Sequence, residues 1–187
     1  MRQLHIIILL SIIVTSTSAT TGFCQATISG DSIKNMLIKD WQRGKDYTQE
    51  YMKAMRANKY SFKATDSVRS FAQQLLHIAQ ANMFLVSTAT GEKSSYSGPD
   101  LEKSTTAQSA DSVAYYVNSS YDFVINAIKK LPASSLMQTA TLNMGRALTE
   151  TRFSWLLKAF EHQSHHRGQT TIYLRLAGVR PPNERLF

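Results

Sequence analysis

The chain has 187 residues, a length that suits one domain with a substantial core. Hydrophobic residues make up 43% of it, which excludes a disordered chain, and only 8 glycines and 4 prolines leave room for long helices. The formal net charge is +8, but the basic residues are scattered among acids and never run longer than Lys129-Lys130, which argues against a nucleic-acid partner.

The first 26 residues have the layout of a secretory signal peptide. Arg2 precedes an apolar run over residues 4–14, and small and hydroxyl residues follow with no further charge before Asp31. The run is too short for a membrane span, which needs about 20 residues. We predict cleavage after Ala26, which leaves a domain of residues 27–187 that is periplasmic or secreted and has no stable membrane anchor. Cleavage after Ala19 and an uncleaved anchor are the alternatives.

Cys24 is the only cysteine of the chain. A lipoprotein would carry its lipid on such a residue, but Phe23 stands where a small side chain is expected, so we do not expect a lipoprotein. Cleavage after Ala26 removes Cys24 and with it any cysteine nucleophile, disulfide or cysteine-based zinc knuckle.

Two segments with helical periodicity come next in the chain. The first covers about residues 31–57, with an apolar stripe that includes Leu37 and Trp41, and Asp31 is its expected cap. The second covers about residues 66–87, with Thr65 or Asp66 as the expected cap. A loop rich in small polar residues follows it.

The third helical segment covers about residues 104–131 and ends at Pro132, which cannot donate the next hydrogen bond. Residues 133–148 are ambiguous between a short extended piece and an irregular linker. The fourth segment covers about residues 149–177, where Gly178 is a natural end signal. Four helical segments without clear strand alternation predict an all-α four-helix bundle.

Four histidines lie beyond the predicted signal peptide, at positions 77, 162, 165 and 166. His162 and His166 are four apart, so they share one helix face and can chelate one cation; a solvated helix face is the alternative. His77 lies in an apolar stretch, where a hydrogen-bonded core histidine is the alternative. Together these three would supply neutral nitrogen donors with coordination positions left open, which suits a catalytic metal.

Further side chains are weaker candidates. His165 points away from its neighbours and could contact a substrate, move a proton or face water, and a His162–His165 pair is the less favoured chelate. Gln163 stands where the HExxH zinc motif has its glutamate, so that motif's general base is missing. Candidates for substrate contact, each with a plain structural role as its alternative, are Gln73, Asn82, Arg167 and Tyr173.

Three stretches, DWQRGKDYTQEYM, RSFAQQLLHIAQAN and HQSHHRGQTTIYLRLAGVRPPNE, occur in this order and resemble the DinB/YfiT-like family over about residues 31–184. The resemblance implies an up-down-down-up bundle that holds a divalent metal, most often nickel or zinc and otherwise manganese or iron, through His77, His162 and His166. It also implies a homodimer and a hydrolase or thiol S-transferase acting on a small molecule. A non-catalytic metal-binding or structural bundle is the alternative. The signal peptide departs from the family pattern and puts a cytoplasmic thiol cosubstrate in doubt.

Overall fold

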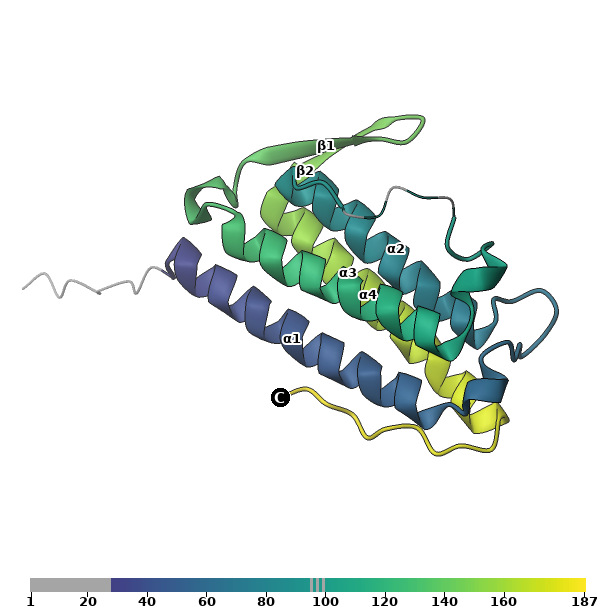
Figure 1. The fold of residues 1–187 in the computed structure, drawn as a ribbon. Helices are drawn as coiled ribbons and strands as arrows, with labels where there is room; N and C mark the ends of the chain where they lie inside the picture. The colour runs from purple at the N-terminus through teal and green to yellow at the C-terminus, as the bar shows by residue number, and fades with distance from the viewer. Residues whose placement is uncertain (1–27, 95, 97, 99) are drawn as a thin grey trace, which may run out of the picture.

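The computed structural model describes residues 28–94, 96, 98 and 100–187, so the predicted signal peptide and Cys24 lie outside the described residues. Four helices pack as a bundle (Figure 1). They are α1 (Gly30–Ala54), α2 (Phe71–Thr90), α3 (Ala110–Lys130) and α4 (Arg152–Leu176). Short 3-10 turns lie between them at Ala57–Lys59, Thr105–Ala107 and Ala133–Ser135. The predicted four-helix bundle is confirmed.

The helices run up, down, down and up (Figure 1). Lys34 near the start of α1 donates to the carbonyl of Lys129 at the end of α3 at 3.1 Å, so these two helices are antiparallel. Arg152 at the start of α4 donates to the carbonyls of Ala89 and Thr90 at the end of α2, at 3.3 and 3.1 Å. Because α2 and α3 are parallel, the chain between them must return along the bundle, and this connection passes beside α2 (Figure 1).

The start of α2 differs from the prediction. Its cap is Ser70 and not Thr65 or Asp66: the Ser70 hydroxyl accepts from the Gln73 amide at 3.2 Å, and the Gln73 side chain accepts from the Ser70 amide at 2.8 Å. This reciprocal pair satisfies two amides that the helix itself leaves free. The Ser-x-x-Gln signature is in the sequence, but earlier polar residues offered a competing start.

The predicted start of α1 is one residue off, and those of α3 and α4 are several residues too early. Ser29 caps α1 with its hydroxyl, and Asp31 lies in the first turn, where a negative charge is favourable. Helix α3 begins at Ala110, behind the cap Ser109, and not near residue 104. The predicted ends are closer: α3 stops just before Leu131-Pro132, and Gly178, with a φ of 74°, follows α4.

A hairpin occupies the ambiguous segment before α4. Strands β1 (Thr139–Asn143) and β2 (Ala147–Thr151) pair antiparallel, with Thr139 opposite Thr151. Trp155 of α4 donates its indole N–H to the carbonyl of Ala140 at 3.0 Å, which ties the hairpin to the bundle. The extended alternative was therefore correct, and the all-α description misses one two-stranded hairpin.

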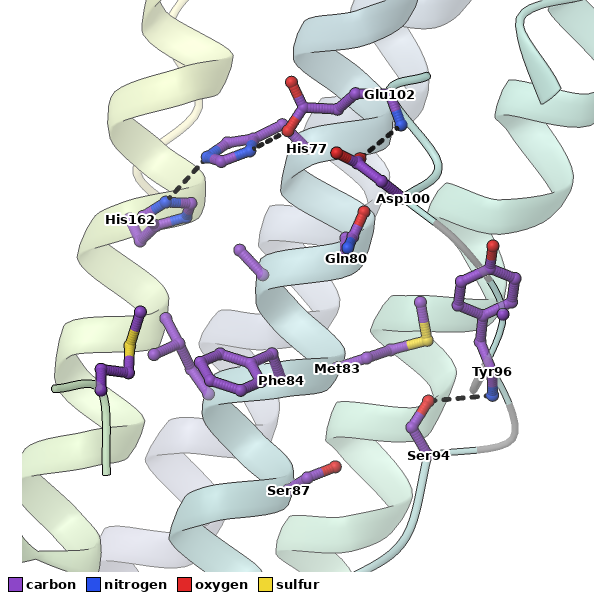
Figure 2. A pocket seen from close by; sticks show the side chains of 14 residues that line it. His77, Gln80, Met83, Phe84, Ser87, Ser94, Tyr96, Asp100, Glu102 and His162 are labelled. Carbon is purple, nitrogen blue, oxygen red and sulfur yellow. Dashed lines mark hydrogen bonds and ion pairs between the residues drawn. The ribbon is translucent and has the colours of Figure 1, made fainter. Parts of the chain in front are cut away.

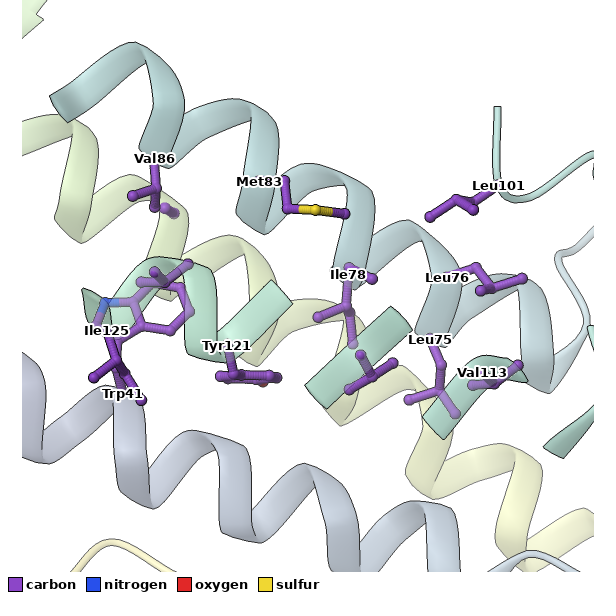
Figure 3. Packing of buried hydrophobic residues seen from close by; sticks show 14 of the residues in the cluster. Trp41, Leu75, Leu76, Ile78, Met83, Val86, Leu101, Val113, Tyr121 and Ile125 are labelled. Carbon is purple, nitrogen blue, oxygen red and sulfur yellow. The ribbon is translucent and has the colours of Figure 1, made fainter. Parts of the chain in front are cut away.

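The core lies where the four helices face one another (Figure 3). Trp41 of α1 makes edge contacts with the rings of Tyr121 and Phe160, at centroid distances of 5.7 and 5.4 Å. Leu75 and Ile78 of α2 are fully buried in the same core cluster. None of the helices in the described part of the chain combines the length and apolar composition needed to cross a bilayer.

Candidate metal centre

Three histidines from two helices converge at one point of the bundle. Nε2 of His77 on α2 lies 3.2 Å from Nε2 of His162 on α4. The ring of His166 has its centroid 4.3 Å from that of His77 and 4.5 Å from that of His162. One nitrogen from each ring lies within 4.8 Å of the other two, a separation compatible with bonds of about 2 Å to one central ion. The cluster could therefore hold a metal ion.

Helix geometry and packing each contribute to this convergence. His162 and His166 are one turn apart on α4 and therefore share a face. Helices α2 and α4 pack antiparallel, which brings that face against the first half of α2, where His77 lies. His166 is buried, while His77 and His162 are partly buried.

Burial leaves two of the rings neutral. Burial first, and then the charge of the neighbouring His77, lower the pKa of His162 from 6.5 to about 4. The pKa of His166 falls to about 4 for the same reasons in the same order. An imidazole must be neutral to coordinate a metal. His162 and His166 are already neutral near pH 7, so metal binding does not require either ring to release a proton.

A carboxylate orients His77. Oε1 of Glu102 lies 2.5 Å from Nδ1 of His77 (Figure 2). Arg69 forms an ion pair with the same carboxylate. With Nδ1 engaged, Nε2 faces the other two histidines. A carboxylate on the outer nitrogen of a metal ligand fixes the ring and raises its basicity. Glu102 was not predicted from the sequence, because it comes 25 residues after His77 in an irregular connection.

Amide oxygens hold His166 in a similar way. Its Nδ1–H donates to Oε1 of Gln74 at 3.0 Å and to Oε1 of Gln169 at 2.9 Å, which leaves the lone pair on Nε2. His162 differs, because its Nδ1 is buried and has no hydrogen-bond partner among the described residues. Three imidazoles, two of them held through their outer nitrogen so that the other nitrogen faces the cluster, form a donor set that fits a nitrogen-coordinated metal.

A pocket of about 650 Å³ opens directly beside the cluster. His77 and His162 line one end of it (Figure 2). One face of α2, the connection between α2 and α3, and Met144 in the hairpin turn form the remaining walls. A molecule bound in this pocket would therefore lie against two of the three histidines.

The remaining candidates on α2 have structural contacts. Gln73 belongs to the cap of α2, and its side chain also donates to the carbonyl of Glu102 at 3.1 Å. Asn82 is fully buried and donates to the Ser120 hydroxyl at 3.3 Å, which joins α2 to α3. Neither residue lines the pocket beside the histidines.

The candidates on α4 also lie away from the pocket. Arg167 is buried, donates to Oε1 of Gln163 at 2.5 Å, and stacks over the ring of Tyr47 on α1 at 4.8 Å. Tyr173 is buried and donates its hydroxyl to the carbonyl of Arg69 at 2.6 Å. His165 is exposed and contacts the His166 ring edge-on at 4.9 Å.

Comparison with known proteins gives one family and one fold. The sequence matches the DinB family over residues 29–185. A crystal structure of a DinB-like protein from Bacillus cereus superposes with a TM-score of 0.66 at 19% identity, over 81% of this chain and 97% of that one. A DinB-like protein from Bacillus subtilis superposes with a TM-score of 0.59 at 18% identity, over 82% of this chain and 97% of that one. No curated protein matches the chain.

Proposed function

This chain belongs to the DinB family, and on that premise we propose that it binds one divalent metal ion through His77, His162 and His166 and uses it in hydrolysis or group transfer on a small molecule. The convergence of three imidazole nitrogens within 4.8 Å of one another carries the proposal. The adjoining pocket supports it, because a substrate bound there would reach the same ion.

Three nitrogen ligands leave coordination positions for water or substrate. Imidazole donors suit nickel or zinc, and manganese or iron are the next candidates. When bound, such an ion polarises a substrate and lowers the pKa of a coordinated water or thiol. The chain's own contribution is to hold the ligands in place: Glu102 orients His77, and Gln74 and Gln169 orient His166.

Two further parts of the proposal concern the setting of the reaction. The predicted signal peptide supports an exported, periplasmic or secreted protein, where a cytoplasmic thiol would be absent and water is the available nucleophile. The family resemblance supports a homodimer. Cell fractionation and light scattering of the mature protein test these two points separately.

A non-catalytic metal-binding module is the second candidate, because the same histidines would serve it. Elemental analysis of the mature protein without a histidine tag, as purified and after reconstitution, tests the site. We expect one equivalent of metal, its loss in His166→Ala, and its retention in His165→Ala, the exposed neighbour. Absence of stoichiometric metal in the folded wild-type protein would refute both candidates.

Turnover then separates the two candidates. A panel of small uncharged esters and amides, assayed with the metal-loaded and metal-free protein, should show metal-dependent hydrolysis if the chain is an enzyme. Binding of one metal without turnover of any of these substrates would favour the binding module.

A further inference from the structure

We infer that the pocket beside the histidines binds an uncharged, elongated apolar molecule, with a metal-coordinating head group at His77 and His162 and an apolar tail along α2. The inference rests on the proposed function, because the head group needs the ion. It adds the class of substrate, which the metal site alone does not specify.

The pocket follows one face of α2. His77, Gln80, Phe84 and Ser87 recur every three or four residues, so they line the same side of the helix. Ser87 comes ten positions after His77, which corresponds to about 15 Å of helix. Figure 2 shows His77 and His162 at one end, Ser87 and Ser94 at the other, and Met83 and Phe84 between them. The space is therefore long, with the metal ligands at one end only.

The middle of the pocket presents apolar side chains to solvent. Phe84 is 46% exposed, and Met144 in the hairpin turn is 62% exposed. Ala81, Met83 and Leu85 complete this lining. An apolar tail would cover these surfaces and gain the free energy of removing them from water. The flexible methionine side chains would adapt to its shape.

The charges of the pocket argue against an ionic tail. None of the described residues that line it is Lys or Arg, and the charged ones are Asp100 and Glu102. Both carboxylates already have partners: Asp100 accepts from the Glu102 amide at 3.0 Å and pairs with Lys103, while Glu102 engages His77 and Arg69. An anionic tail would find no cation, and a cationic tail would find no free carboxylate.

The far end of the pocket carries the serines Ser87 and Ser94 and no charged side chain. Oγ of Ser87 is buried and not exposed in the pocket, so it offers no hydrogen bond to a bound molecule. The far end therefore agrees with an uncharged tail.

Three hydroxamates test the inference, because the hydroxamate group chelates metals and the tail can be varied. Zinc-reconstituted protein is titrated by calorimetry with acetohydroxamate, octanohydroxamate and suberic monohydroxamate, which carries a carboxylate at the end of a tail of the same length. Each buried methylene should tighten binding about fourfold. We expect octanohydroxamate to bind at least about 100-fold more tightly than acetohydroxamate. Suberic monohydroxamate should bind at least about tenfold more weakly than octanohydroxamate, because its carboxylate finds no cation in the pocket.

Two variants link the effect to the pocket. Phe84→Asp and Met144→Asp change exposed side chains and should weaken octanohydroxamate at least about tenfold while leaving acetohydroxamate unchanged. Met137→Asp is the matched control, since Met137 is 70% exposed and lies outside the pocket lining. If the two pocket variants behave like this control, the inference is wrong.

The titrations also separate this inference from the proposed function. If the three hydroxamates bind with equal affinity, the metal centre stands and the apolar tail site is refuted. If zinc is bound but no hydroxamate binds, the ion has no accessible coordination position, and the proposed catalytic function fails together with the inference.

Discussion

Replacing Glu102 with glutamine should weaken metal binding while the fold is retained. The carboxylate lies 2.5 Å from Nδ1 of His77, and its side chain is only 19% exposed, so solvent screens the contact weakly. Glutamine keeps an acceptor of similar size but removes the charge that raises the basicity of the ring. Loss of such an outer partner costs about 10–100-fold in metal affinity, or about 1.4–2.8 kcal/mol.

A competition titration of zinc against a chromophoric chelator measures this change. Glu92→Gln is the matched control, because Glu92 belongs to the same connection, forms an exposed ion pair with Lys130 at 3.0 Å, and lies outside the pocket beside the histidines. We expect this control to bind zinc within about twofold of wild type, since exposed pairs contribute little. Circular dichroism and urea unfolding establish that both variants are folded.

The outcome decides the role of the carboxylate. If folded Glu102→Gln protein binds zinc as tightly as wild type, Glu102 does not support the ligand His77, and its contact with the ring is only a packing feature. If Glu92→Gln loses as much affinity as Glu102→Gln, the effect comes from the charge of the connection as a whole.

Three further predictions concern stability. Because burial lowers the pKa of His162 and His166 to about 4 from 6.5, the unfolded chain binds more protons between these values. The metal-free protein should thus lose stability as the pH falls through this window, and a urea midpoint that stays flat there would contradict it. Zinc at 100 times its Kd should add about 2.7 kcal/mol, seen as a higher Tm in wild type but not in His77→Ala. Ser70→Ala should cost about 1 kcal/mol in urea unfolding through loss of the α2 cap, whereas Ser67→Ala, in the preceding loop, should be close to neutral.

Much of the fold could be predicted from the sequence because helices are local structures. The apolar stripe through Leu37 and Trp41 indicated α1, and Pro132 marked the end of α3. Helix starts were less certain because several short polar side chains compete as caps. Ser70 prevails over Thr65 and Asp66 because its hydroxyl accepts from the backbone N–H of Gln73 while the Gln73 side chain accepts from the backbone N–H of Ser70.

The hairpin before α4 was harder to predict. Its strands are five residues each, too short for a clear alternation, and they depend on contacts with the bundle such as the Trp155 bond to Ala140. Sequence patterns report a strand well only when one of its faces is regularly buried.

The sequence by itself determined one part of the candidate site, the His162–His166 pair, because a separation of four residues places two side chains on one face of any α-helix. The sequence offered His77 as a third donor, but only the tertiary structure decided that it meets this pair and that Glu102 lies behind it. Those contacts span 85 and 25 residues and depend on how α2 packs against α4 and on the path of the connection beside α2. Local periodicity carries no information about such distances, since packing of whole helices sets them.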